Sequence, residues 1–496
     1  MAVWKENRSA ARRFGHTMIG VALGVAAIQG ANAAPPEEES HPTMLSADDP
    51  ATSGGESPTS PAQAPSSKTM LGDMGGLRPF LGQYGLTFIL QETSEVLGNV
   101  SGGNRKGWAY DGVTQAALQM DTDQALGIAG GTINVSALQI HGRNLSSDNL
   151  QSLQTASGIS ANRSSRLWEL WYQQKFFDDD RLDVKIGQQS IDQEFMASQN
   201  AALFVNTMFG WPMLPSADLP DGGPAYPLSA PGIRARAQAS ESVTVLAGVF
   251  NGRPTAKASL DSQRENASGT SFPTNGGILA IGELQYAVAS ATAVAHADEA
   301  PTAPVGLYKV GVWYDSERFN DLRYDHDGRS LASPNSNGDP LTHRGNLAFY
   351  AVADQMVWQS TDQEDRAVSL FARIMGTPDD DRNIIDFALN AGVTIHAPLP
   401  ERNEDSFGIG IGYAKVSSRA SALDRDVERY GGSYTPARSE ETFVEVTYQV
   451  QMTPWWQLQP DFQYVFNPGG GVTGRYDAAH KTGNETIVGA RTNITF

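Results

Sequence analysis

The 496-residue sequence contains no cysteine. This absence excludes disulfide bonds, thiol catalysis and thiolate metal sites. Beyond the first 33 residues there is also no run of about 18 apolar residues, so no membrane-spanning α-helix is predicted. Basic residues are outnumbered, with 36 Lys and Arg against 55 Asp and Glu and a formal net charge of −19. Such an acidic chain repels a phosphate backbone, so nucleic acid is not expected as a partner.

Residues 1–33 have the pattern of an export signal. A basic leader that includes Arg12 and Arg13 precedes an apolar stretch from Met18 to Ile28, and Ala31-Asn32-Ala33 fits a small-residue cleavage site. An amphipathic N-terminal helix is the alternative.

Residues 34–76 form a different kind of segment. Because they are dense in Pro, Ser, Ala and Thr and have few residues to form a core, they predict a disordered periplasmic linker, with partner binding as the alternative. A short helix or turn around Met70 to Leu81 is expected to lead into the main domain at 77–496.

From Gly85 onward the chain divides into segments of about ten residues that alternate between apolar and polar side chains, separated by turn-rich stretches. Strands that cross an outer membrane need about 9 to 11 residues. The mean hydropathy of −0.34 is compatible with this class, because only every second residue of such a strand is apolar. The sixteen candidate strands are 85–96, 108–120, 131–142, 165–177, 181–189, 231–239, 242–250, 277–287, 305–315, 345–358, 366–376, 383–397, 405–417, 441–452, 454–467 and 485–496.

The clearest segments separate their side chains into two faces. One face of 385–395 is apolar from Ile385 through Leu389 to Ile395, and 308–314 alternates Tyr308, Val310, Val312 and Tyr314 with more polar residues. The last segment ends on Phe496 in the same way. The fold class predicted is therefore all-β, a transmembrane antiparallel barrel of about 16 strands with long extracellular loops, short periplasmic turns and a polar face lining water. A soluble β-sandwich that turns its apolar face into a core remains the alternative.

Several strings in this region carry a resemblance to a known family. They are Glu95-Val96-Leu97-Gly98-Asn99, Ser136-Ala137-Leu138-Gln139-Ile140-His141-Gly142-Arg143, Glu169-Leu170-Trp171-Tyr172-Gln173-Gln174, Phe209-Gly210-Trp211-Pro212 and Ala247-Gly248-Val249-Phe250-Asn251-Gly252. The chain resembles the carbohydrate-selective porins, the OprB-like outer-membrane porins, from about Leu77 to Phe496. The resemblance implies a sixteen-stranded barrel in the bacterial outer membrane, narrowed by material folded into its lumen, through which neutral sugars diffuse.

A sugar-selective pore should offer charged hydrogen-bonding groups beside aromatic rings. In the segment 165–177 we expect Trp168, Leu170 and Tyr172 to face lipid. The inward face of that segment then carries Glu169, Trp171, Gln173 and Lys175. In 131–142 the apolar side chains change from odd-numbered positions, Ile133 and Val135, to even-numbered ones, Leu138 and Ile140. This change predicts a bulge near Ala137 and leaves open which face His141 and Arg143 occupy.

Other candidate pore-lining residues come from neighbouring segments: Arg143, Arg234, Arg236, Glu283, Asp192 and Glu194. The segment 191–230 is the candidate constricting loop, and an extracellular cap is the alternative. For the inward arginines the alternative is that they pair with carboxylates and stiffen the wall. The acidic turn 379–381 is expected to be solvated, with a divalent bridge to lipopolysaccharide phosphates as the alternative.

The function predicted is passive, carbohydrate-selective diffusion of sugars such as glucose, with no catalytic residue, no cofactor and no metal. Its expected partners are mono- or oligosaccharides and outer-membrane lipid and lipopolysaccharide, and both a monomer and a homotrimer are compatible with the sequence. Three alternatives stay open: a lipase-like barrel hydrolase, a general non-selective porin and a soluble sugar-binding sandwich. The sequence has no G-x-S-x-G string, and Gly408-x-Gly410-x-Gly412 is interpreted as small residues on an inner face rather than a nucleotide motif.

Overall fold

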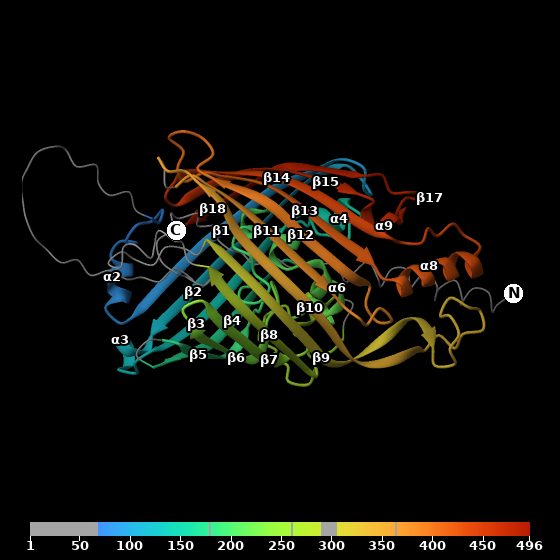
Figure 1. The fold of residues 1–496 in the computed structure, drawn as a ribbon, viewed down its shortest axis with the longest axis horizontal. Helices are drawn as coiled ribbons and strands as arrows, with labels where there is room; N and C mark the ends of the chain where they lie inside the picture. The colour runs from blue at the N-terminus through green and yellow to red at the C-terminus, as the bar shows by residue number, and fades with distance from the viewer. Residues whose placement is uncertain (1–67, 178–179, 259–260, 289–304, 363–364) are drawn as a thin grey trace, which may run out of the picture.

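The computed structural model describes residues 68–177, 180–258, 261–288, 305–362 and 365–496, and sixteen of its strands close into an antiparallel barrel (Figure 1). The predicted export signal at 1–33 and residues 34–67 of the predicted linker lie outside the described residues. Around the barrel, each strand pairs with its neighbour in the chain, and β1 closes the ring against β18.

All sixteen predicted strands are confirmed. The strands of the first half are β1 Leu86–Ser101, β2 Gly107–Asp121, β3 Gly131–Gly142, β4 Ser164–Phe176, β5 Leu182–Gln189, β6 Ala230–Ser240, β7 Val243–Asn251 and β8 Ile278–Val288. The second half contains β9 Gly306–Asp325, β10 Pro340–Gln359, β11 Ala367–Gly376, β12 Ile385–His396, β13 Ser406–Val416, β14 Glu440–Thr453, β15 Trp456–Phe466 and β18 Glu485–Thr495.

The apolar face of the strands lies on the outside of the barrel. In β9, Val310 is 55% exposed and Tyr314 is 44% exposed, whereas the adjacent Lys309 and Asp315 are buried. A sandwich would bury the first pair and expose the second, so the exposure pattern excludes that alternative. The outward residues form the lipid-facing surface of a barrel that spans a membrane.

The polar network on the outer wall of β1 to β3 is an exception to this pattern. His141, whose facing the sequence left open, lies on the outside, where its Nε2 is 2.9 Å from the Tyr110 hydroxyl and 3.4 Å from a Glu92 carboxylate oxygen. Glu92 also accepts hydrogen bonds from Ser94 and Thr114. The polar groups therefore satisfy one another on this face.

The ring closes along the seam between β1 and β18, and the C-terminus lies at one end of this seam (Figure 1). The short helix α2 (Leu77–Gly82), in the region where a helix or turn was expected, sits at this seam. Its Arg78 donates one hydrogen bond to the carbonyl oxygen of Phe88, at 2.9 Å, and another to that of Phe496. One guanidinium thus ties the first barrel strand to the end of the last.

The two ends of the barrel differ in their connections. The end near the C-terminus has short turns such as 397–405 and carries α3 (Thr122–Leu126). The opposite, extracellular end carries α8 (Ser418–Gly431), α9 (Pro468–Gly471) and the hairpin of β16 (Thr473–Gly474) and β17 (Asp477–Lys481) (Figure 1). None of the helices that the structure describes is long and apolar enough to cross a membrane.

Strands β9 and β10 are longer than predicted and extend through about half of the region 316–344 that separates the two predicted strands. Helix α8 occupies much of 418–440, between two further predicted strands, where a long extracellular loop was expected. Its N-cap is Ser417, whose side chain accepts a hydrogen bond from the Ala420 N–H, and Gly432 ends it in the left-handed conformation. Both capping residues can be identified in the sequence.

Two side chains that were predicted to face lipid are in fact inside the barrel. Trp168 is fully buried because the β3–β4 register shifts beside Ser136 and Ala137 and leaves Trp168 as an extra residue of β4. The predicted irregularity near Ala137 is therefore present, but the bulged strand is β4. Ile385 is also fully buried, since the β12–β13 register shifts between it and Phe387.

The lumen is not the open, water-lined bore that the width of the ring alone predicted, because the candidate constricting loop 191–230 folds into it. Residues 190–229, between β5 and β6, fold inside the barrel and form the long lumen loop. Residues 143–163, between β3 and β4, also fold inward and form the short lumen loop, which contains α4 (Leu145–Asn149). The long lumen loop holds four short helices: η1 (Ala201–Leu203), α5 (Thr207–Gly210), α6 (Met213–Asp218) and η2 (Pro220–Gly222).

An apolar core joins the long lumen loop to the barrel wall. The Phe209 ring lies 5.7 Å from that of Phe371 on β11 and 5.3 Å from that of Phe443 on β14, in edge-to-face contact, and Phe204 stacks against Phe209 at 4.3 Å. Aromatic pairs in such geometry are worth about 0.5–1.5 kcal/mol each beyond the area that they bury. The barrel therefore has an internal hydrophobic core in addition to its lipid-facing surface.

Glycines on the inner face of β13 make room for this core. A Cβ on Gly410 would lie 2.5 Å from Phe209 Cζ and 2.9 Å from Phe204 Cε1. A Cβ on Gly408 would lie 2.8 Å from Phe204. The string Gly408-x-Gly410-x-Gly412 thus consists of small inner-face residues, as predicted, and it lets the loop rings approach the wall closely.

We predict that Gly410→Ala lowers the free energy of unfolding of the barrel by about 1–3 kcal/mol, because the new methyl group overpacks the phenylalanine cluster. Urea unfolding of the protein refolded in detergent micelles measures this. Gly282→Ala is the matched control, because the nearest atom to its Cβ is the Leu246 carbonyl oxygen at 3.9 Å. Equal losses of stability in the two variants would contradict the close packing described for Gly410.

Candidate functional site

Inward carboxylates of the wall hold the long lumen loop through its backbone N–H groups. Glu445 on β14 accepts hydrogen bonds from the N–H groups of Val205 at 2.6 Å and Asn206 at 2.9 Å. Glu283 on β8 accepts one from the Met196 N–H at 2.8 Å. A loop taken out of water must have its polar backbone groups satisfied, and the oxygens of these side chains accept the hydrogen bonds that do so.

Further contacts come from Asp354 on β10. One oxygen of this carboxylate accepts hydrogen bonds from the Ser198 hydroxyl at 2.6 Å and from both the backbone N–H and the side-chain amide of Asn200. Asn200 is also bonded to Thr394 on β12. Side chains of two wall strands thus fix the turn at Ser198 to Asn200.

Arg373 on β11 supplies hydrogen-bond donors for the backbone carbonyl oxygens of the long lumen loop. Its guanidinium donates hydrogen bonds to the backbone carbonyl oxygens of Met196, Met208, Phe209 and Gly210, with distances of 2.8–3.0 Å for three of them. The side chain is 1% exposed, and its planar set of donors suits several acceptors at once. One arginine therefore gathers two turns of the loop against the wall.

The loop in turn supplies a carboxylate to the wall. Asp218 at the end of α6 accepts hydrogen bonds from the N–H groups of Ile384 at 2.9 Å and Ile385 at 3.3 Å, just where β12 begins. The side-chain amide of Asn346 on β10 donates to the Asp218 carbonyl oxygen at 3.1 Å. The interlocking is reciprocal, so the loop and the wall stabilise each other.

The short lumen loop is held by the same chemistry. Glu441 on β14 accepts hydrogen bonds from the N–H groups of Leu153 and Gln154, both at 2.7 Å, and Glu485 on β18 accepts one from Gln151 at 2.6 Å. The two loops are also joined directly, because the Gly158 N–H donates to the Val205 carbonyl oxygen at 2.8 Å.

Several of the predicted pore-lining residues meet where the long lumen loop leaves β5. Glu194 on the loop is paired with both Lys185 on β5 and Arg234 on β6, and Arg234 also pairs with Asp183. Burial alone would raise the pKa of Glu194, but the charges and hydrogen bonds of Lys185 and Arg234 outweigh it and lower the pKa to about 2. Glu194 is therefore ionised at any physiological pH.

Glu169 and Trp171 lie on the inner face of β4 beside this cluster. Lys185 Nζ sits 4.4 Å from the centroid of the Trp171 ring, a cation–π contact. Glu169 accepts a hydrogen bond from the Ser190 N–H at 3.1 Å, and Asp192 accepts from the Ser190 hydroxyl at 2.6 Å. Both Glu169 and Trp171 are buried, so the loop covers them rather than leaving them in contact with open water.

The remaining predicted residues are more dispersed. Arg236 faces inward with 16% of its side chain exposed, 4.0 Å from Asp183. Gln173 is half-buried on the same inner face of β4 as Glu169, and Lys175, farther along, is 3.0 Å from Asp180 in a solvent-exposed pair. Arg143 follows the end of β3 and lies 3.6 Å from Asp148, also exposed.

Sequence reasoning missed the residues that hold the two loops: Arg373, Asp354, Glu441, Glu445, Glu485 and Asp218. One signal was available, since Arg373 is a single inward charge between the inward apolar residues Phe371 and Met375. An isolated charge on an otherwise apolar inner face requires a partner from elsewhere in the chain. The alternation shows the face of each residue, but it does not identify the partner.

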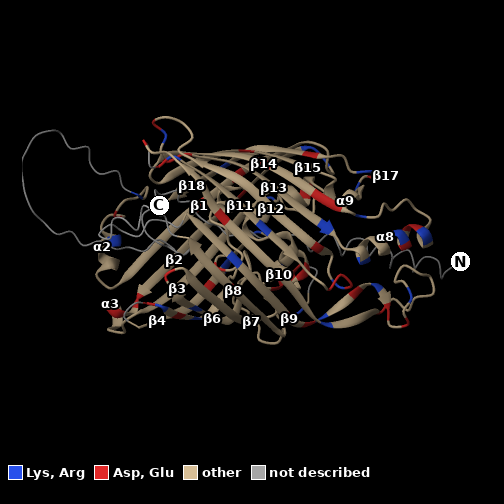
Figure 2. Ribbon diagram, in the orientation of Figure 1, with Lys and Arg blue, Asp and Glu red and all other residues tan. Residues whose placement is uncertain are grey.

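Figure 2 shows how charge is distributed over the whole structure. Along the middle of the barrel most residues are uncharged, whereas charged residues gather in the loops and in α8 at the ends. A closed barrel with an apolar outer surface, charged inner anchors and a loop folded into the lumen is the architecture of an outer-membrane porin.

Residues 105–496 match the family described as carbohydrate-selective porin, OprB family, and the chain belongs to that family. It is therefore a carbohydrate-selective porin of the bacterial outer membrane, as the resemblance predicted. Both the family and the fold are those of a channel rather than of an enzyme.

Two curated relatives and one solved structure agree with this assignment. The chain is 27% identical to Porin B of Pseudomonas aeruginosa over 433 residues, which cover 82% of this chain and 89% of that protein. It is 22% identical to the putative porin QuiX of Acinetobacter baylyi over 419 residues, or 81% and 89% of the two chains. The high-pH structure of Pseudomonas putida OprB has a TM-score of 0.74 at 23% identity, covering 88% of this chain and all of that one, and shows the same fold.

Replacing Arg373 tests the anchoring of the long lumen loop. We predict that Arg373→Met leaves the barrel closed but raises cleavage of the loop by chymotrypsin about tenfold or more, because losing charge-assisted hydrogen bonds to four carbonyls costs about 3 kcal/mol or more. Heat-modifiable migration on a gel reports the barrel, and the cleavage rate near Phe204 to Trp211 reports the loop.

The matched control is Arg366→Met. Arg366 directly precedes β11, the strand that carries Arg373, and donates a hydrogen bond to the Ala397 carbonyl oxygen at 3.0 Å. Ala397 lies in a turn at the end of the barrel opposite the extracellular end. Its replacement should leave the cleavage rate unchanged. A loop that remains resistant in Arg373→Met would show that the guanidinium does not hold it.

Proposed function

We propose that neutral sugars such as glucose diffuse passively through the space that the long lumen loop leaves open inside the barrel, without covalent chemistry and without a cofactor. The observation that supports this is the anchoring of the loop at many points around the wall, by Glu283, Asp354, Arg373 and Glu445 on four different strands. A loop held so widely narrows the lumen to a fixed shape, which a selective channel requires.

The charges near the loop are arranged to suit a neutral, hydroxyl-rich solute. Glu194 is balanced by Lys185 and Arg234, and Arg234 also pairs with Asp183. Paired charges present hydrogen-bond donors and acceptors in fixed directions while producing a weaker long-range field than isolated charges. The cluster therefore adds little net field to the passage, so it neither repels a neutral sugar nor binds an ion tightly. The weak contacts that permit passage come from side chains that are left partly exposed.

We propose different roles for two groups of the predicted residues. Those that are buried position the loop: Glu169, Trp171, Asp192, Arg234 and Glu283. Those with exposed side-chain surface contact the passing sugar: Gln173, Lys175, Glu194 and Arg236 inside the barrel, and Arg143 at the outer mouth. The division follows from burial, because a side chain excluded from water is also excluded from a sugar that travels in water.

The roles of the N-terminal segments and of the outer surface are also proposals. We propose that 1–33 is an export signal, that 34–76 is a periplasmic linker, and that the outer surface of 77–496 contacts membrane lipid and lipopolysaccharide. A monomer and a homotrimer both fit this surface. A general diffusion porin is the second candidate function, because the same fold without sugar contacts passes any solute of suitable size.

Single-channel recording in planar bilayers tests the proposal directly. Glucose is expected to reduce the ion current in a saturable way, whereas a non-sugar solute of similar size is not. Equal effects of the two solutes would favour the general diffusion porin.

We predict that Arg236→Gln raises the glucose concentration that blocks half of the ion current roughly fivefold. This factor corresponds to the loss of one hydrogen bond worth about 1 kcal/mol. Arg264→Gln is the control for loss of one positive charge, since Arg264 lies in an external loop with 83% of its side chain exposed. Identical glucose titrations for wild type and Arg236→Gln would remove Arg236 from the sugar path.

A further inference from the structure

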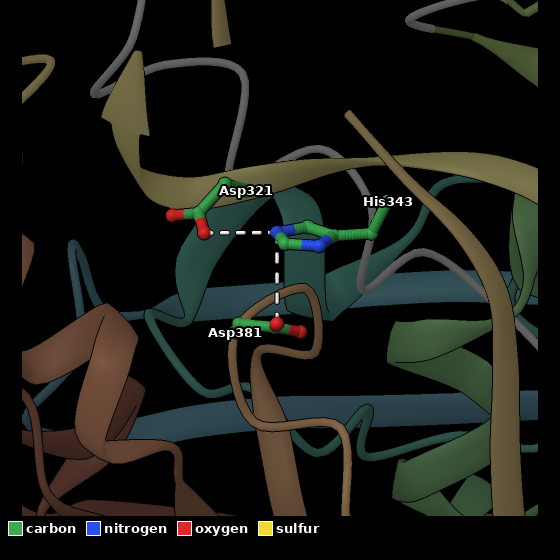
Figure 3. Close-up of side chains that lie close together, drawn as sticks. All are labelled: Asp321, His343 and Asp381. Carbon is green, nitrogen blue, oxygen red and sulfur yellow. Dashed lines mark hydrogen bonds and ion pairs between the residues drawn. The ribbon is translucent and has the colours of Figure 1, made fainter. Parts of the chain in front are cut away.

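A second cluster of chemically active side chains lies at the extracellular rim, away from the lumen contacts. It consists of Asp321 on β9, His343 on β10 and Asp381 in the turn between β11 and β12 (Figure 3). His343 Nε2 is 2.9 Å from Asp321 Oδ2 and 3.6 Å from Asp381 Oδ2. One ligand atom from each residue lies within 4.8 Å of the other two.

Both carboxylates point at the same ring nitrogen. Figure 3 shows Asp321 and Asp381 approaching His343 Nε2 from two directions. A single N–H at Nε2 makes a hydrogen bond to the nearer oxygen, at 2.9 Å, but the oxygen at 3.6 Å is too distant for a good one. A histidine that served only to pair with two acids would use its two nitrogens, one for each carboxylate. Convergence on one nitrogen is instead the arrangement of ligands around a shared ion.

The separations also fit an ion. A metal about 2.1 Å from each of two ligand atoms holds those atoms roughly 3 to 3.5 Å apart. The two measured separations from Nε2, 2.9 and 3.6 Å, lie close to this interval. Small rotations of the Asp381 side chain would complete the set.

Contacts behind the ligands fix two of them in place. Asp321 is 3% exposed, and its Oδ1 accepts hydrogen bonds from the N–H groups of Arg323 and Tyr324, both at 2.8 Å, so its Oδ2 is aimed at His343. Asp381 Oδ1 accepts from Arg382 Nε at 2.8 Å, and a weaker contact from the same guanidinium reaches Oδ2 at 3.4 Å. Bonds to the non-ligating oxygen that orient a carboxylate are typical of metal sites.

The backbone also joins two of the three segments. The Leu322 N–H donates to the Asp381 carbonyl oxygen at 2.9 Å, next to the proposed ligands in both segments. The site is therefore formed where the extended β9–β10 hairpin meets the β11–β12 turn. It draws on residues of the acidic turn 379–381, which the sequence alone predicted to be solvated.

We propose that Asp321, His343 and Asp381 bind a divalent transition-metal ion of the Zn²⁺ class at the extracellular rim. One imidazole nitrogen with two carboxylate oxygens suits Zn²⁺ and its neighbours, whereas Ca²⁺ and Mg²⁺ prefer oxygen ligands alone. The remaining coordination positions are filled by water. The bound ion links the β9–β10 hairpin to the neighbouring β11–β12 turn. The site is separate from the proposed sugar path.

Metal binding is tested with tag-free, full-length protein in detergent after removal of metal by a chelator. Titration calorimetry with Zn²⁺ should show a saturable site at one equivalent per chain. Co²⁺ should give visible absorption bands whose intensity reports coordination by nitrogen and oxygen. Glucose block of the ion current serves as a separate readout, because failure of metal binding leaves the proposed sugar transport intact.

Variants locate the site. His343→Ala and Asp381→Asn, which lie in different segments, should each weaken Zn²⁺ binding roughly tenfold or more. His326→Ala is the matched control, because His326 lies in the same extracellular hairpin, 3.8 Å from Asp339, and is about half exposed. Its replacement should leave the one-equivalent site unchanged.

Two results would overturn the proposal. One is wild-type protein that binds no Zn²⁺ beyond the level of His343→Ala. The other is equal loss of binding in His326→Ala, which would indicate scattered surface histidines. Heat-modifiable migration confirms that each variant has a closed barrel, and if His343→Ala fails to fold, Asp381→Asn and the wild-type Co²⁺ spectrum still decide the question.

Discussion

The structure depends on one constraint: a chain segment folded into a barrel must find partners for its backbone polar groups. The two lumen loops lie inside the ring, where few of their N–H and C=O groups reach water. Inward carboxylates such as Glu441 and Glu445 accept from the N–H groups, and Arg373 donates to the carbonyls. Each such bond contributes about 0.5–1.5 kcal/mol when both groups are neutral and about 1.5–3 kcal/mol when one is charged, as for Arg373, so the anchors together offset part of the entropy lost on ordering the loops.

The same constraint explains why charged residues lie inside a barrel whose outer surface is apolar. A carboxylate excluded from water is tolerated only where it is hydrogen-bonded or paired. Glu445 has two backbone N–H partners, and Glu194 has Lys185 and Arg234. In the proposed function, the anchors fix the loop, the fixed loop sets the width of the passage, and the side chains left partly exposed, such as Arg236, contact the sugar. Selectivity in this account comes from a rigid shape with weak contacts rather than from a tight binding site.

Much of the fold follows from local pattern. The two-residue alternation locates all sixteen strands, and in most of them it assigns the faces correctly, as for Lys309 and Val310. It fails where the register shifts, at Trp168 and Ile385, because a bulge moves a side chain to the other face without any change of composition. The site was harder to predict, since the partners of Arg373 lie more than 160 residues away in the chain. Sequence identifies such a charge as inward, but only the folded chain brings its acceptors to it.

The position of the long lumen loop can be measured by cross-linking, because the natural chain has no cysteine. Asn206 on the loop and Gln463 on β15 are hydrogen-bonded through their side chains at 3.0 Å. With both replaced by cysteine, a short thiol-reactive cross-linker should join them in the folded protein in a membrane, and the joined channel should retain its glucose-sensitive ion current. A pair that never cross-links in the closed barrel, or a joined channel that no longer conducts, would contradict a loop held in the lumen beside an open sugar path.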